Sequence, residues 1–260
     1  MKIKIVRIMK KYLATMIILS FLGCGAVSAS NAESTPPDHA VFDRLLKRYV
    51  DDYGLVDYKS LKENRDELDA YLSILEANAP SDSWTTNERL AYWINAYNAF
   101  TLDLIVEFYP VSSIKDIGAI IQIPFINTPW DIKFIKIGEE LYDLNNIEHG
   151  IIRREFDEPR IHFALVCAAM SCPRLRNEAY EAIRLEEQLS SAAREFLADT
   201  AKNRIINSAE AELSKIFLWY GGDFKEEQSL ISFLNTYAPI QLAEDASLDY
   251  LDYSWELNEQ

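Results

Sequence analysis

The stretch RIHFALVCAAMSCPRL, from Arg160 to Leu175, is the segment around which the rest of the chain is organised. It opens with an apolar run, which predicts either a buried strand or a very apolar helical turn. His162 stands at its start, Cys167 in its middle and Cys172 in a Ser-Cys-Pro corner. An apolar segment that also carries histidine and cysteine predicts a place in the core and a candidate site for thiol or imidazole chemistry.

Residues 1–29 are predicted to be a signal peptide and not part of the fold. Five basic residues and no acid precede an apolar run, Tyr12 to Gly23, that is too short to span a bilayer comfortably. Residues 30–38 are polar and are expected to tether a single domain over 39–260. Acylation of Cys24, as in a lipoprotein, is the alternative. We therefore expect a periplasmic protein, or one anchored by lipid to the cell envelope.

The chain is strongly acidic. Its 260 residues carry a formal net charge of −15, which becomes −20 once the five basic residues of 1–29 are removed. This charge argues against a nucleic-acid partner, because phosphate binding depends on clustered Lys and Arg. Membrane contact is expected only through the signal peptide or a lipid on Cys24, and the sequence identifies no other partner. An apolar content of 49% suffices for a substantial core in one large domain.

The strongest periodic pattern predicts a central helix that starts at Thr85 or Thr86 and stops at Tyr109-Pro110. Glu88 suits the third position of a capping box. Apolar residues then recur at spacings of three and four: Leu90, Trp93, Ile94, Tyr97, Thr101, Leu104, Ile105 and Phe108. Asn95 and Asn98 lie beside this stripe. Buried amides are costly when unpaired, so they either hydrogen-bond neighbouring backbone or orient a ligand or a catalytic group.

The other elements predict an α+β fold, helix-dominant, with a small and mostly antiparallel sheet. Helical patterns cover about 40–51, 61–77, 144–154, 178–199 and 228–236. Lys133 to Tyr142 reads as a hairpin that turns at Gly138-Glu139. Residues 203–207 are expected to be extended, and 248–255 to form a short closing strand.

The candidate chemistry is nucleophilic catalysis by a thiol. A thiol reacts as the thiolate, which needs a nearby base or positive field. We take Cys172 as the candidate nucleophile and His162 or His149 as the base. The orienting group is then Asn98, Glu148 or Asp223, which would complete a Cys–His–Asn or Cys–His–acid set.

Three alternatives stay open. Cys167 and Cys172 could form a disulfide if the chain turns between them, which would remove the thiol. His162, His149, Glu148 and Cys172 could bind a metal, but no close-spaced ligand motif supports this, and we expect neither metal nor cofactor. The stretch could also be a core segment with a buried histidine and structural cysteines.

Several ordered motifs resemble the domain of unknown function 547 family. They are Tyr92-Trp93-Ile94-Asn95-Ala96-Tyr97-Asn98, the 144–149 helix with Arg153 or Arg154, His162 to Pro173, Tyr180, Trp219 to Phe224, and the closing 250–255 segment. The resemblance implies an exported bacterial type and no agreed activity. It also implies a shared cluster of Asn95, Asn98, Glu148, His149, His162, Cys172 and Asp223. We expect a thiol hydrolase or acyl transferase, or else a non-catalytic binding or scaffold module of the envelope.

Overall fold

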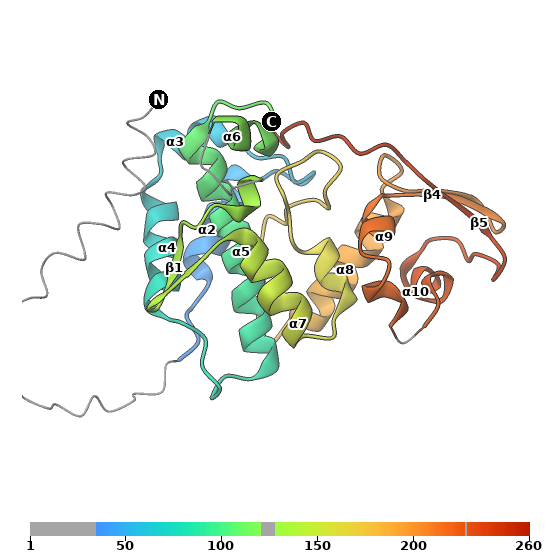
Figure 1. The fold of residues 1–260 in the computed structure, drawn as a ribbon, viewed down its shortest axis with the longest axis horizontal. Coiled ribbons are helices and arrows are strands. Elements are labelled where there is room, and N and C mark those ends of the chain that lie inside the picture. Colours follow the sequence, from blue (N-terminus) through green and yellow to red (C-terminus); the bar gives the residue numbers. More distant parts are fainter. Residues whose placement is uncertain (1–34, 121–127, 227) are drawn as a thin grey trace, which may run out of the picture.

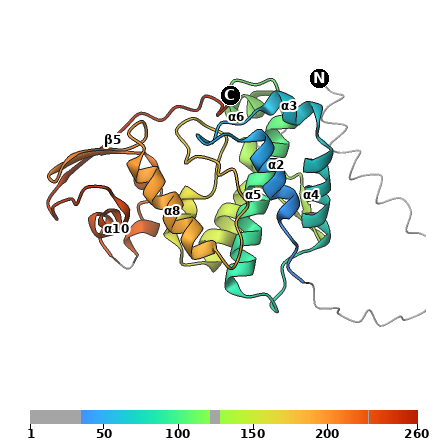
Figure 2. The same cartoon turned by 180° about the vertical axis from the view of Figure 1, so that it is seen from behind.

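The computed structural model describes residues 35–120, 128–226 and 228–260. The predicted signal peptide and Cys24 lie outside these ranges. One half of the molecule is a group of helices: α2 (Ala40–Tyr49), α3 (Tyr58–Glu63), α4 (Asp66–Ala77), α5 (Thr86–Phe108) and α6 (Ile114–Ile120). Figures 1 and 2 show α2 and α4 beside the long α5 from both sides. None of the described helices is long and apolar enough to cross a bilayer.

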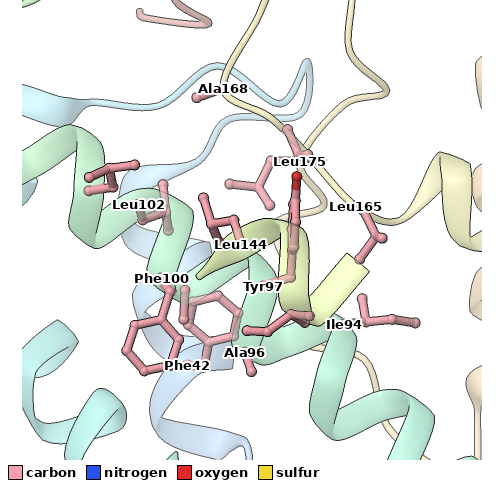
Figure 3. Packing of buried hydrophobic residues seen from close by; sticks show 14 of the residues in the cluster. Phe42, Ile94, Ala96, Tyr97, Phe100, Leu102, Leu144, Leu165, Ala168 and Leu175 are labelled. Carbon is pink, nitrogen blue, oxygen red and sulfur yellow. The ribbon is translucent and has the colours of Figure 1, made fainter. Parts of the chain in front are cut away.

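Helix α5 is the centre of the larger core, as its periodicity predicts. Thr85 and Glu88 form the expected capping box at its start. Nearly every residue from Leu90 to Phe108 is buried, because helices pack on several sides of α5. Figure 3 shows Phe42 of α2 beside Phe100 of α5, with Leu144 and Leu165 from later segments over the same helix. The predicted central helix is therefore confirmed.

A hairpin and an irregular helix follow. Strands β1 (Ile135–Ile137) and β2 (Glu140–Tyr142) pair antiparallel, with Gly138 at a positive φ of 59° in the turn. The helix predicted over 144–154 is instead mostly a π-helix, η3 (Asn146–Ile152), that continues into α7 (Arg153–Glu155). Single-turn π segments are rare and occur often at functional sites.

The second half of the molecule holds a smaller core. Helix α8 (Leu185–Ala198) and helix α10 (Leu230–Tyr237) pack together, and α9 (Ile216–Trp219) lies beside them. A three-stranded sheet has the order β3 (Arg204–Asn207), β4 (Glu210–Leu213) and β5 (Ser247–Tyr250). Strands β3 and β4 are antiparallel, whereas β4 and β5 are parallel. Together with the hairpin this confirms a helix-dominant α+β fold with small, mostly antiparallel sheets.

The C-terminal segment connects the two halves. After β5 the chain runs back across the molecule to the first helical group, where the C-terminus lies near α3 and α6 (Figure 1). Val56 pairs in parallel with Glu259, and the Leu257 N–H donates to the Ser112 carbonyl. This return, residues 251–260, carries Tyr253 and Trp255 across the space between the two cores.

The Arg160–Leu175 stretch is not a strand. It begins in a 3-10 helix, η4 (Pro159–Phe163), in agreement with the alternative of an apolar helical turn, and then continues as an irregular buried loop. Two other boundaries differ from expectation. The helix predicted over 61–77 is divided at Asn64, whose side chain bonds the Ser60 carbonyl and ends α3. The helix predicted from Glu178 begins only at Leu185, because long-range hydrogen bonds hold the preceding backbone.

Candidate functional site

A cavity of about 440 Å³ lies where η3, the central loop, α9 and the C-terminal return meet. Six of its 16 lining residues are Trp or Tyr, and Asn145, Glu148, His149, Arg153 and His162 supply polar groups. Its lining residues include Tyr97, Trp130, Glu148, His149, Arg153, His162, Cys167, Cys172, Trp219, Tyr220, Tyr253 and Trp255. This combination of mainly apolar walls and a few convergent polar groups is characteristic of small-molecule sites.

His162, Asp223 and Arg153 form a hydrogen-bonded chain. His162 Nε2 lies 2.7 Å from Asp223 Oδ2, and Arg153 donates to both oxygens of that carboxylate over 2.6 Å. Burial alone would raise the pKa of Asp223, but the bonds from His162 and Arg153 outweigh it and hold that pKa far below its usual value. Burial lowers the pKa of His162, so the imidazole is neutral at pH 7 and donates from Nε2 to Asp223.

Glu148 is held by two tyrosines. The Tyr220 hydroxyl donates to Glu148 Oε1 over 2.7 Å, and the Tyr97 hydroxyl bonds the same carboxylate. Burial, followed by the negative charge of Glu148, raises the pKa of both phenols far above the ordinary value. Both hydroxyls therefore stay protonated and act as donors. The Tyr220 ring also stacks on His162, with ring centroids 4.0 Å apart, which links Glu148 to the His162 chain.

The π-helix positions His149. Its Nδ1 lies 3.1 Å from Arg153 Nη1, one turn further on. Arginine has only donors, so Nδ1 is the acceptor and the proton of the neutral ring is on Nε2. The His149 side chain is 43% exposed, in contrast to 2% for His162. His149 is thus the imidazole that a ligand entering from solvent meets first.

Asn95 and Asn98 hold the loop that forms one wall of the cavity. Asn98 Nδ2 donates to the Ala164 carbonyl over 2.9 Å, and its Oδ1 accepts from the Val166 N–H over 3.0 Å. Asn95 does the same with the carbonyl and N–H of Tyr180, over 2.8 and 2.9 Å. Both amides are therefore engaged with backbone, which corresponds to the first of the two readings of this pair.

Cys167 and Cys172 are joined by a disulfide. Cys172 is 3% exposed, whereas Cys167 is only partly buried. The Cys172 sulfur accepts from the Cys167 N–H and from the Tyr253 hydroxyl, each over 3.1 Å. No hydrogen bond joins either sulfur to an imidazole among the described residues. In this oxidised form the nucleophile proposed from the sequence has no thiol.

The structure brings most of the sequence candidates together. His162, His149, Glu148 and Cys172 line the cavity, Asp223 lies behind His162, and Asn95 and Asn98 act through the loop. Several aromatic residues of the site were not among the candidate site residues of the sequence: Tyr97, Trp130, Tyr220, Tyr253 and Trp255. The density of aromatics around 219–220 and 250–255 was the available indication. Within the described parts of the chain, no group of three or more His, Cys, Asp and Glu side chains is placed to hold a metal ion.

Fold and cavity together define a helix-dominant α+β protein with a cavity lined by aromatic and polar side chains. Residues 81–197 match the family described as "Protein of unknown function, DUF547", and this match supports the assignment of the chain to that family. The match includes Asn95, Asn98, Glu148, His149, His162 and both cavity cysteines. It ends before Tyr220, Asp223 and Tyr253, which complete the site from outside it. Neither the curated proteins nor the solved structures contain a match to the chain.

Proposed function

We propose that the protein binds a small organic cation, such as an amine, in the aromatic cavity. The observation that carries this proposal is the Glu148 carboxylate, which is held by neutral hydroxyls within aromatic walls. The Arg153 charge is paired with Asp223 in a bidentate contact. The formal charges of Glu148, Arg153 and Asp223 therefore sum to −1, which favours a positively charged ligand.

The aromatic walls support the same ligand class. The negative faces of Trp and Tyr rings attract ammonium groups, with about 0.5–2 kcal/mol for each favourable contact. Lys115 shows this property on one ring of the cavity lining, because its Nζ lies 3.6 Å from the centroid of the Trp255 ring. The net charge of −15 also attracts cations and repels anions. His149 Nε2–H adds one donor for a neutral polar group on the ligand.

Binding can be measured by tryptophan fluorescence, since Trp130, Trp219 and Trp255 line the cavity. Benzylammonium, benzyl alcohol and benzoate share a ring and differ in charge. We expect benzylammonium to bind most tightly and Glu148→Gln to weaken its binding about tenfold. Binding of benzyl alcohol should change little in this variant. Glu187→Gln, at a position 69% exposed on α8, is the matched control and should leave all three affinities unchanged.

Two results would contradict the proposal. One is benzoate binding as tightly as benzylammonium. The other is equal affinity of benzylammonium for the wild type and for Glu148→Gln, provided that circular dichroism shows the variant to be folded.

A thiol hydrolase or acyl transferase is the second candidate, and it applies only to the reduced protein. The two donors on the Cys172 sulfur favour it, because hydrogen bonds to a thiolate stabilise the reactive form. After reduction, Cys172 should be alkylated by iodoacetamide well below the ordinary thiol pH range, and Cys172→Ser should abolish turnover of an activated ester. Alkylation only after denaturation would rule this candidate out.

Export is part of the proposal. The Cys167–Cys172 disulfide supports it, because such bonds persist in oxidising compartments such as the periplasm. Cell fractionation with N-terminal sequencing tests it: the mature protein should begin near residue 30 and leave the cytoplasm. Recovery of the full-length chain from the cytoplasm with reduced cysteines would contradict export.

A further inference from the structure

We propose that the Cys167–Cys172 disulfide is a reactive group of the cavity that exchanges with small thiols, with Cys167 as the sulfur attacked and Cys172 as the sulfur released. Three features of the disulfide carry the inference: its place in the cavity wall, the unequal access to its sulfurs and the hydrogen bonds to one of them.

The two sulfurs differ in how accessible they are to a thiol that enters the cavity. Both cysteines line the cavity, but Cys172 is 3% exposed and Cys167 is only partly buried. A thiolate must approach the sulfur that it attacks. A small thiol entering the cavity from solvent therefore reaches Cys167 in preference to Cys172.

Hydrogen bonding favours the same direction. When the bond breaks, one sulfur receives the electron pair as a thiolate, and a better-stabilised thiolate leaves faster. The Cys172 sulfur already accepts from the Cys167 N–H and the Tyr253 hydroxyl, each over 3.1 Å. The same hydroxyl is 3.6 Å from the Cys167 sulfur. Cys172 is thus the sulfur prepared to carry negative charge.

Tyr253 is a fixed donor. Its ring packs against Trp219 and Trp255, with centroid distances of 4.8 Å to each. Burial, and then the nearby Glu148 charge, raises the pKa of Tyr253 far above the ordinary value, so the hydroxyl keeps its proton. A donor held in place strengthens its hydrogen bond when the acceptor becomes charged.

Reduction of the Cys167–Cys172 disulfide consumes two small thiol molecules. The first thiolate attacks Cys167 Sγ, the Cys167–Cys172 bond breaks, and its electron pair goes to Cys172 Sγ. The second thiolate attacks the small-molecule sulfur of the mixed disulfide on Cys167. This releases the oxidised small disulfide, and the two thiol protons end on Cys167 and Cys172. A small disulfide runs the same steps in reverse and restores the bond.

The favoured thiol class follows from the cavity charge, and this refinement rests on the proposed function. Glu148 favours a thiol that carries an ammonium group. Cysteamine, 2-mercaptoethanol and thioglycolate are similar in size and differ in charge. Each rate is divided by the rate of the same thiol with a free peptide disulfide, which removes the effect of thiol pKa. We expect this normalised rate to decrease in the order cysteamine, 2-mercaptoethanol, thioglycolate. Glu148→Gln should reduce the differences between the three rates, whereas Glu187→Gln should leave them unchanged.

The experiment on the exchange itself uses the native, oxidised protein without denaturant and follows loss of the disulfide by mass after acid quenching. We expect reduction much faster than unfolding, and a rate roughly 3- to 10-fold lower for Tyr253→Phe. Tyr237→Phe, on α10 in the other core, is the matched control and should react like the wild type. Equal rates for Tyr253→Phe and the wild type, or reduction only as the protein unfolds, would overturn the proposal.

Single-cysteine variants test the direction of attack independently of Tyr253. At a pH high enough to ionise both thiols, so that the thiolate fraction does not decide the rate, cystamine should form a mixed disulfide with Cys167 rapidly in Cys172→Ser and with Cys172 slowly in Cys167→Ser. The reverse order would overturn the assignment of the attacked sulfur. If exchange proceeds but shows no dependence on thiol charge, the cation preference of the cavity fails and the exchange chemistry stands.

Discussion

Replacing Asn98 by alanine should destabilise the protein strongly, because this buried amide holds the cavity loop to α5. The substitution removes the bonds to the Ala164 carbonyl and the Val166 N–H and leaves both backbone groups without these partners inside the protein. Each such loss costs about 1–3 kcal/mol. We therefore expect the free energy of unfolding to fall by about 2–6 kcal/mol, a large part of the stability of an ordinary domain.

Urea unfolding of the oxidised protein, followed by fluorescence and by far-UV circular dichroism, measures this loss. Asn87→Ala on the same helix is the matched control. Its amide is exposed and makes one 3.4 Å bond, so the expected change is below about 0.5 kcal/mol. The alternative role of Asn98, orienting a ligand or a catalytic group, predicts loss of binding with little loss of stability.

Free energies of unfolding of Asn98→Ala and Asn87→Ala that agree to within about 0.5 kcal/mol would refute the reasoning. Removal of a buried amide that bridges two backbone groups must cost more than removal of an exposed one. Asn98→Asp separates the two bonds. It keeps an acceptor for Val166 and loses the donor to Ala164, so it should also destabilise.

Three further outcomes follow from other parts of the structure. Thr85→Ala removes the capping box of α5 and should cost about 1 kcal/mol in urea unfolding; an unchanged midpoint would contradict this. Burial lowers the pKa of His39 to about 4, and its Nδ1 is 2.7 Å from the Tyr71 hydroxyl. The unfolded chain therefore binds the proton first, so stability should fall by about 2 kcal/mol from pH 7.5 to 5, and His39→Gln should remove that part of the loss. The pKa of Asp223 is lowered in the folded protein, so the ionised carboxylate contributes to folding stability at pH values above the usual carboxyl pKa. This contribution is lost as the pH falls through the lowered pKa of Asp223. Asp223→Asn should accordingly destabilise at pH 7 by about 2 kcal/mol and by less below pH 4, with His162 titrating at a changed pH in NMR spectra; a destabilisation independent of pH would contradict the ionic role.

Elements made by neighbouring residues could be predicted from the sequence. The apolar stripe and the Thr85–Glu88 box are local, and helix α5 follows them closely. The hairpin at Gly138 needs only alternation and one residue that tolerates positive φ. Elements whose limits are set by long-range contacts could not be predicted from the sequence. Helix α8 starts late because Asn95 holds the backbone of Tyr180, and nothing near residue 180 in the sequence indicates it.

The candidate site shows the same division. His162 and Cys172 are conspicuous in the sequence, but their partners are distant along the chain. Asp223 is 61 positions from His162, and Tyr253 is 81 positions from Cys172. The roles proposed for these residues stay predictions. What the structure adds is which groups meet: an imidazole with a carboxylate, and two sulfurs with each other and a phenol.

The sequence by itself determined the fold class, the central helix, the family and the set of residue types from which the site is built. These depend on local periodicity, capping and residue identity, all of which follow from the order of neighbouring residues. Only the tertiary structure decided that the sulfurs pair, that the asparagines hold backbone, and that the C-terminal return closes an aromatic cavity over Glu148. Those contacts depend on how two separate cores pack, and no periodicity within a single segment encodes that packing.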